Sequence, residues 1–454
     1  MTTETLRSLL STLGWAAPTD EVEVAGHDPI LQTRFLIGNA AAATLAAIGL
    51  AVSDVWELRT GRRQNVSVSV PFAAAALLSF TFQQIDEGET PRRGPRITDF
   101  YRTRDGRWFL LHGGFPKNQE AALKLLDCSG DKEDIAKAVS GWDGQALEDE
   151  MGERGLCGAM VRSAGEWRAH PQGQALAERP LVEVVRVGDS PVEPAGFGSR
   201  PLSGVRVLDL TRVLAGPTCG RTLAEHGADV LRIDSPNLPN VPGFVMDTGH
   251  GKRSAHLDLT DPEDVERLRG LVRDADVFTQ GYRLGALDRL GFGPEALSDL
   301  RPGLIYTSIN CYGHEGPWKS RPGWEQLAQS VTGIAAEHGG PARPRLLPAA
   351  ATDYTTGYLA ALGTLIALTR RAREGGSYHV RVSLSRTGMW IDSLGRSEAI
   401  GAGLTAESVE PVLTVSDTPY GRIRHLGPVL ELSETPPHWA LPTVPLGTHK
   451  AAWT

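Results

Sequence analysis

The length and composition of this chain are those of a folded protein with more than one hydrophobic core. Its 454 residues exceed what a single core usually organises, so we expect two or three domains. Hydrophobic residues account for 41% of the sequence and charged residues for 22%, and the formal net charge is -8. An acidic chain of this composition argues against a general nucleic-acid or membrane-surface binder.

The four cysteines stand alone in the sequence, with no CxxC or CxxH spacing between them. This pattern predicts neither a structural zinc site nor a disulfide framework and is typical of a reducing compartment. The first residues lack a basic stretch followed by an apolar one, and we expect no apolar run of 18 residues after them. The sequence therefore predicts a cytoplasmic protein without a bound metal.

The first segment, residues 1–85, predicts an opening helix, an Ala/Leu-rich helix, a basic glycine turn and a short strand. The stretch LAAIGLAVSDVWELRTGRRQNVSVSV at 45–70 has a second copy, LAALGTLIALTRRAREGGSYHVRVSL, at 359–384. Gly49 aligns with Gly363 without a gap, and the alternating Val-x-Val strand also aligns. Shared glycine, arginine and strand positions favour a duplication over a chance likeness of two helices.

The two copies differ at one position that decides their chemistry. Six residues before the Leu-Ala-Ala run, the first copy has Asn39 and the second has Asp353. A carboxylate can attack as a nucleophile and titrate as an acid, whereas an amide can do neither. Only the second copy therefore retains a reactive group here.

Residues 86–199 predict a small α+β domain. It begins with a Pro/Arg/Gly linker, TPRRGPRITD at 90–99, followed by a hairpin that turns at Asp105-Gly106. Helices are expected at about 120–126 and 134–139, and a short strand at 181–187.

Residues 200–454 predict a Rossmann-like parallel sheet, because short apolar strands alternate with helices. The strands fall at 204–210, 228–234, 276–279 and 304–309, and the first is followed by a turn, TRVLAGP, and a helix that ends at Gly227. The fold class is thus α/β with a smaller α+β domain. Asp234 lies where a ribose-binding acid would stand, but the turn lacks GxGxxG, which disfavours a nicotinamide cofactor.

Six segments between Gly204 and Gly333 occur together in a recognisable order: GVRVLDLTRVLAGP, HGADVLRID, KRSAHLDL, ADVFTQGYRLGALDRLGFGPEAL, IYTSINCYGHEGP and GWEQLAQSVTG. In this order they resemble the family III CoA-transferases, the superfamily of formyl-CoA transferase and the α-methylacyl-CoA racemases. The closing PLGTH is also similar to that family. The resemblance implies a ring-like, interlocked homodimer, although the order of parts here resembles a rearranged, partial tandem duplication.

The same resemblance implies where the chemistry occurs. Asp353 stands at the family's spacing after the pair Trp324-Glu325, and it would attack an acyl-CoA thioester to begin transfer of CoA to a carboxylic acid. The alternative for Asp353 is a helix N-cap, and the alternative for Glu325 is an ordinary first-turn glutamate. The racemase branch has a histidine where this chain has Trp324, and tryptophan has no basic nitrogen, so racemisation is disfavoured. His338, in an expected loop, is the nearest downstream histidine that could supply such a base, but a loop histidine is more often only solvent-exposed.

The resemblance also implies a CoA site, with coenzyme A bound as the substrate thioester. Each implied residue has a structural alternative, such as a core leucine, a packed tyrosine or a surface arginine, and Gly281-Tyr282 departs from the family's Asn-Phe. The implied residues are Val213, Ala215, Leu257, Leu259, Tyr282 and Arg289.

Two further functions stay open on the sequence alone. A degenerate paralogue that binds CoA or an acyl thioester without turning it over would suit Asn39 and the rearranged order. An acyl-CoA isomerase or lyase would use the same scaffold for another reaction.

Overall fold

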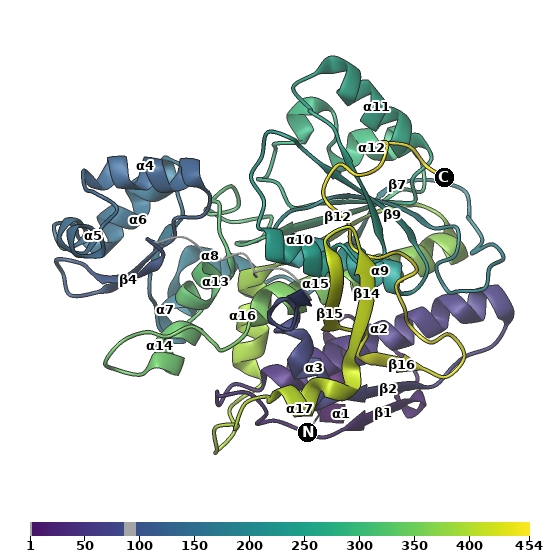
Figure 1. Cartoon of the computed structure of the whole chain (residues 1–454), viewed down its shortest axis with the longest axis horizontal. Helices are drawn as coiled ribbons and strands as arrows, with labels where there is room; N and C mark the ends of the chain where they lie inside the picture. The colour runs from purple at the N-terminus through teal and green to yellow at the C-terminus, as the bar shows by residue number, and fades with distance from the viewer. Residues whose placement is uncertain (1, 86–96) are drawn as a thin grey trace.

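The largest element of the molecule is a seven-stranded sheet in the order β10-β9-β8-β11-β12-β13-β7. The computed structural model describes residues 2–85 and 97–454 (Figure 1). Six strands are parallel, and β7 pairs antiparallel with β13 at one edge. The prediction of a Rossmann-like parallel sheet is confirmed. The strands are β7 Glu183–Gly188, β8 Arg206–Leu210, β9 Asp229–Asp234, β10 Lys252–His256, β11 Val277–Gln280, β12 Ile305–Asn310 and β13 Ser377–Ser383.

Helices cover both faces of this sheet because its strands are apolar on both sides. Val207 belongs to the core shared with helices α9 (Ala215–Glu225) and α15 (Ala351–Glu374), whereas Leu208 belongs to the opposite core. That second core is closed by α11 (Pro262–Arg273) and α12 (Pro294–Leu300). Consecutive residues of a strand therefore face different helical layers.

The N-terminal segment lies beside α15 rather than apart from it. Helix α2 (Ile37–Thr60) packs against α15 and is flanked by α1 (Thr2–Thr12) and α3 (Val70–Ala76) (Figure 1). Below them a small sheet has the order β1-β2-β16 (Val22–Ala25, Val66–Ser69 and Leu430–Leu432).

Helix α2 is long and apolar enough to cross a membrane by length and composition. Its uninterrupted apolar stretches are shorter than the 18 residues named above, because Asn39, Thr44 and Ser53 lie between them. However, 89% of its most apolar window is buried inside the protein. Such burial is typical of a core helix.

The small α+β unit stands on the left in Figure 1 and has its own hydrophobic core. Its sheet, β4-β5-β6 (Asp99–Arg102, Trp108–Leu111 and Gly158–Met160), is antiparallel, and Gly106 turns the predicted hairpin with φ of 75°. The predicted helices are present and somewhat longer. They are α4 Pro116–Leu126 and α5 Lys132–Val139, followed by α6 Gly144–Glu153, α7 Ala164–Ala169 and α8 Pro171–Ala177.

Three expectations need correction or fall outside the structure. The strand expected at 181–187 does not belong to the small unit, since it is β7 and its backbone pairs with β13 of the large sheet. Helix α9 begins at Ala215 and so includes part of the expected turn. Most of the linker at 90–99 lies outside the described residues.

Candidate active site

Asp353 lies in the first turn of α15, at the end of a buried segment. The N-cap of this helix is Ala350, so Asp353 occupies the third helical position and is not the N-cap. Its side chain is partly exposed, whereas the flanking Thr352 and Tyr354 are buried. Among the described residues, no side chain or backbone group donates a hydrogen bond to the Asp353 carboxylate, which leaves its oxygens free to react.

Glu325 takes over the capping of this helix from a distance in the sequence. It begins α13 (Glu325–Val331) and is only 5% exposed. One carboxylate oxygen, Oε2, accepts the backbone N–H of Asp353 at 2.5 Å and the hydroxyl of Thr352. The other, Oε1, accepts the N–H of Thr352 at 3.1 Å and the side-chain amide of Gln329 at 2.6 Å. Glu325 therefore fixes the backbone that carries Asp353, and it is not an ordinary surface glutamate.

Glu325 is buried and Asp353 is half-buried, and they lie close enough for the charge of Glu325 to affect the ionisation of Asp353. Burial raises the pKa of Asp353 well above its usual range, and the neighbouring charge of Glu325 raises this pKa further. Burial also raises the pKa of Glu325, against the lowering effect of its hydrogen bonds from Thr352 and Gln329. Among the described residues, no lysine or arginine forms an ion pair with either acid. Asp353 is thus a partly desolvated acid with no cationic partner among the described residues.

Trp324 connects the acid pair to the small unit. Its indole N–H donates to the Sγ of Cys157 at 3.2 Å. The ring of His112 stacks on it with centroids 5.5 Å apart and planes 12° apart, and Phe115 meets it edge-on. His112 also lies 3.1 Å, Nε2 to Oε1, from Gln326. The small unit therefore closes one side of the site.

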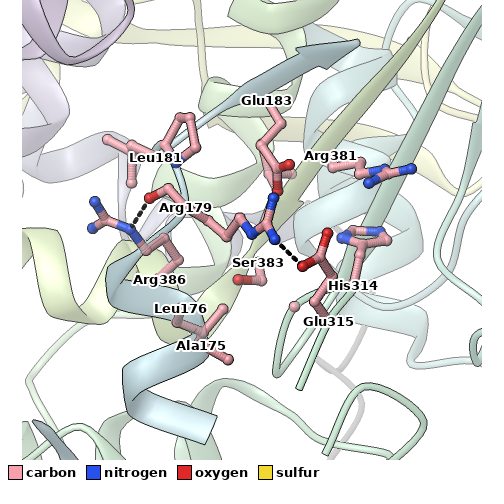
Figure 2. A pocket seen from close by; sticks show the side chains of 13 residues that line it. Ala175, Leu176, Arg179, Leu181, Glu183, His314, Glu315, Arg381, Ser383 and Arg386 are labelled. Carbon is pink, nitrogen blue, oxygen red and sulfur yellow. Dashed lines mark hydrogen bonds and ion pairs between the residues drawn. The ribbon is translucent and has the colours of Figure 1, made fainter. Parts of the chain in front are cut away.

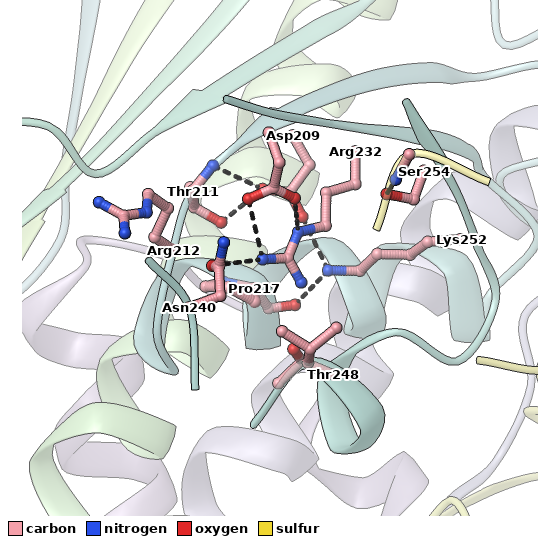
Figure 3. Close-up of polar contacts among 12 residues, drawn as sticks. Asp209, Thr211, Arg212, Pro217, Arg232, Asn240, Thr248, Lys252 and Ser254 are labelled. Carbon is pink, nitrogen blue, oxygen red and sulfur yellow. Dashed lines mark hydrogen bonds and ion pairs between the residues drawn. The ribbon is translucent and has the colours of Figure 1, made fainter. Parts of the chain in front are cut away.

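The turn after β8 is held by a buried ionic network, shown in Figure 3. The ammonium of Lys252 lies 2.7 Å from a carboxylate oxygen of Asp209 and 2.7 Å from the carbonyl of Pro217, while Thr211 donates to the same carboxylate. These three side chains are at most 1% exposed. Because an uncompensated buried charge is costly, the pairing fixes the turn against α9.

That turn lies directly beside helix α15. Val213 has φ of 70°, a conformation that a β-branched residue rarely adopts and that marks a constrained backbone. Gly357, one turn after Asp353, packs so closely that an added Cβ would meet the carbonyl oxygen of Ala215 at 2.4 Å. The guanidinium of Arg212 lies over the ring of Phe115 at 4.8 Å. The structure thus brings the turn and the acid pair together with an aromatic wall, the rings of Trp324, His112 and Phe115.

The family model described as CoA-transferase family III matches residues 11–197 and 202–403. The chain is a member of CoA-transferase family III.

Its relatives agree with this membership. The chain is 34% identical over 385 residues to the acetyl-coenzyme A transferase nodX of Hypoxylon pulicicidum, which covers 73% of this chain and 64% of the relative. An acyl-CoA transferase of Gibberella moniliformis is 36% identical over 324 residues, or 65% of this chain and 56% of the relative. The chain therefore matches less than two thirds of the length of these relatives. A solved CAIB/BAIF family protein from Brucella suis is 30% identical, with a TM-score of 0.40, over 50% of this chain and 65% of that one.

The other residues that the family resemblance implied for CoA come after the carboxyl ends of strands β10 and β11. Leu257 is 1% exposed and belongs to the second core, against which Leu259 and Tyr282 pack from its rim. Arg289 lies in a single turn of 3-10 helix and is exposed. Asp234 is buried and ion-paired to Arg232 at 2.6 Å, so it does not offer the free carboxylate that a ribose would need.

Sequence reasoning missed the contribution of the small unit. His112, Phe115 and Cys157 contact Trp324, but no spacing rule connects them to it. In the sequence, the pair Gly113-Gly114 was the available sign of a close contact in this region. Gly114 lies against the indole of Trp324, where an added Cβ would meet Nε1 at 3.6 Å. His338 is in the short helix α14 (Ile334–Gly339), not in a loop, and its Nδ1 lies 3.3 Å from the hydroxyl of Thr33.

Two further features lie away from this constellation. Figure 2 shows a pocket between α8, β7 and the end of β13, where Arg179 pairs with Glu315 and its carbonyl accepts from Arg386 at 3.0 Å. Burial lowers the pKa of His314 there to about 3, so this imidazole is neutral. Within the described part of the chain, no group of three or more His, Cys, Asp or Glu side chains is placed to hold a metal ion.

Proposed function

We propose that this protein transfers coenzyme A from an acyl-CoA to a carboxylic acid through a covalent intermediate on Asp353. The observation that carries the proposal is the Asp353 carboxylate, free of hydrogen bonds from the described residues, with its backbone fixed by Glu325. Membership of CoA-transferase family III supports the reaction class.

The reaction follows from the chemistry of a carboxylate and a thioester. An Asp353 oxygen attacks the thioester carbonyl, the C–S bond breaks, and a mixed anhydride and CoA thiolate result. The thiolate attacks the aspartyl carbonyl, which releases the first carboxylate and leaves CoA as a thioester on Asp353. The incoming carboxylate then repeats both steps in reverse order and leaves as the new acyl-CoA.

The surroundings of Asp353 suit this exchange. Glu325 positions the nucleophile through its backbone, and the stacked rings of Trp324 and His112 exclude water that would hydrolyse an anhydride. Trp324 carries no basic nitrogen, which argues against proton abstraction from the acyl group at this position. His112 is held between Gln326 and the N–H of Gly114, which donates to its Nδ1 at 3.0 Å.

CoA would lie across the turn that follows β8. The carbonyl of Ala215 lies against Gly357, one turn after Asp353, so a thioester bound over the turn of Val213 and Ala215 would reach Asp353. Arg289 is exposed and available for a phosphate, and Tyr282 packs beside the same core. Leu259 would contact the adenine at the rim of the second core, and Leu257 would support this contact from within that core.

The relatives indicate which substrates to try first. Their names include an acetyl-coenzyme A transferase and a succinyl-CoA:glutarate CoA-transferase of Mus musculus. We therefore propose acetyl-CoA and succinyl-CoA as the first donors to assay, with monocarboxylic and dicarboxylic acids as acceptors.

Intact-protein mass spectrometry after incubation with acyl-CoAs tests the proposal. Wild type should gain a CoA-sized or acyl-sized adduct that hydroxylamine removes, and Asp353→Asn should gain none. The matched control is Asp392→Asn, which alters an aspartate of α16 (Leu384–Ser393) that pairs with Arg396. If wild type binds CoA but forms no adduct with any thioester, the chain is a binding protein or an enzyme with non-covalent chemistry.

A further inference from the structure

The N-terminal helix α2 reproduces the geometry of the catalytic helix α15. Each has 24 residues and no side-chain N-cap, and the capping residues have nearly the same conformation. Leu36 has φ and ψ of -82° and 52°, and Ala350 has -79° and 60°. Asn39 is the third residue of α2, as Asp353 is of α15.

The strands that follow the two helices also have equivalent neighbours. β2 lies between parallel β1 and antiparallel β16, and β13 lies between parallel β12 and antiparallel β7. A Cβ on Gly49 would meet Val66 at 2.4 Å and Leu430 at 3.2 Å. A Cβ on Gly363 would meet Val380 of β13 at 2.6 Å and Val182, the residue before β7, at 2.7 Å.

An acid caps α2 as Glu325 caps α15. The backbone N–H of Asn39 donates to Asp28 at 2.7 Å, and Gly38 lacks a side chain where a Cβ would meet the same carboxylate at 2.6 Å. The residues Gly26-His27-Asp28 thus stand where the second copy has Gly-Trp-Glu. The first copy retains the scaffold of the site.

However, the reactive position of that copy is closed. Asn39 is fully buried, and its Oδ1 accepts the hydroxyl of Thr2 at 3.1 Å and the N–H of Asp28 at 3.0 Å. Thr2 begins α1, which packs on α2, whereas α9 packs on α15. In the second copy, the helix packed on α15 is α9, which follows the turn proposed to bind CoA. In the first copy, the corresponding helix packed on α2 is α1.

The first half of the chain, residues 1–199, instead contributes to the site around Asp353, which lies in the second half, residues 200–454. The N–H of Ala350, the cap of α15, donates to the carbonyl of Leu77 at 3.2 Å. The hydroxyl of Tyr354, next to Asp353, accepts the N–H of Phe80 at 3.1 Å. The small unit, also from the first half, adds Cys157 and the stacked rings around Trp324.

We propose that the first half acts as a built-in partner subunit, so that each chain holds one complete acyl-transfer site and needs no residue from a second chain. This inference rests on the proposed function of Asp353. It concerns which part of the chain supplies the groups around Asp353, namely Leu77, Phe80 and Cys157 from the first half.

Complementation between two inactive chains tests this inference. Asp353→Asn removes the nucleophile of the second half, and Phe115→Glu places a charge in the aromatic wall from the first half. Each variant alone should lose at least about 100-fold in kcat/KM, a loss of about 2.7 kcal/mol in transition-state stabilisation. Co-expressed or mixed, they should recover no activity, and wild-type activity per chain should not change on dilution.

Recovered activity in the mixture, or full activity of Phe115→Glu alone, would overturn the inference. If Phe115→Glu does not fold, His112→Ala replaces it in the same design. Adduct counting gives an independent measurement: wild type and Asn39→Asp should each carry one adduct per chain, and a second adduct in Asn39→Asp would also overturn it. Absence of any adduct in wild type would instead refute the proposed function.

Discussion

Replacing Glu325 separates its two effects on Asp353, namely its charge and its hydrogen bonds. The Glu325→Gln variant removes a negative charge that raises the pKa of Asp353. In the proposed reaction Asp353 attacks as a carboxylate, so activity should fall as the pH drops through its raised pKa. The acid limb of the pH profile of kcat/KM should therefore move to lower pH in Glu325→Gln.

The hydrogen bonds give the expected loss of stability. Glu325 accepts two backbone N–H groups of the first turn of α15, from Thr352 and Asp353. Each buried donor left without an acceptor costs about 1–3 kcal/mol, so Glu325→Ala should lower the free energy of unfolding by about 2–6 kcal/mol. Glutamine keeps one acceptor and removes a buried charge that burial disfavours, so Glu325→Gln should lose less.

Both effects are measured on the same proteins. Urea denaturation gives the free energy of unfolding, and kcat/KM between pH 4 and 9 gives the acid limb. Glu263→Ala and Glu263→Gln are matched controls, since Glu263 is an exposed first-turn glutamate of α11 and should change stability by no more than about 0.5 kcal/mol. An acid limb that stays in place or moves to higher pH would refute the role given to the charge, and an unchanged stability of Glu325→Ala would refute the capping.

Three further changes test the fold around the site. Burial raises the pKa of Glu225 to about 7, so its ionisation opposes folding once the pH rises above the pKa of the unfolded state. Glu225→Gln should therefore raise the free energy of unfolding by up to about 3 kcal/mol at pH 8 and by little at pH 4. Urea denaturation at both pH values measures the difference. Gly363→Ala should cost about 1–3 kcal/mol by overpacking against two valines, whereas Gly270→Ala, with open space around it, should stabilise slightly. Lys252→Met should cost about 3–5 kcal/mol because Asp209 stays buried and charged, and adding Asp209→Asn should restore part of the loss.

The elements of the large sheet could be predicted because local pattern determines them. Short apolar runs such as the one ending at Leu210, each followed by a helical segment, indicate the buried strands of a parallel sheet that helices cover on both faces. The strand β7 was misplaced for the opposite reason. Its residues alternate like any short strand, and only its long-range pairing with β13 shows which sheet it joins.

The candidate site was predictable only where its residues share one segment of chain. Asp353 follows from its place before the repeated helix, and Glu325 from its position at a helix start. Contacts of Trp324 with Cys157 and His112 depend on how the small unit docks on the large sheet, which no local pattern encodes. Asp28 was missed because the segment between the capping acid and the helix is shorter in the first copy, so a comparison without gaps cannot align it with Glu325.

The two similar segments each contain a different half of a potential acid–base pair. The first copy retains His27 next to its capping acid, but Asn39 has no reactive carboxylate and is fully buried. The second copy retains Asp353, but Trp324 occupies the position that corresponds to His27 and donates its only N–H to a thiol. Proton exchange at the α-carbon of an acyl group needs two groups that can hold a proton on opposite sides, whereas acyl transfer needs one nucleophile and a dry pocket. Neither copy has two proton-holding groups at these two positions, so neither meets the requirement for proton exchange. Only the second copy, with Asp353, meets the requirement for acyl transfer.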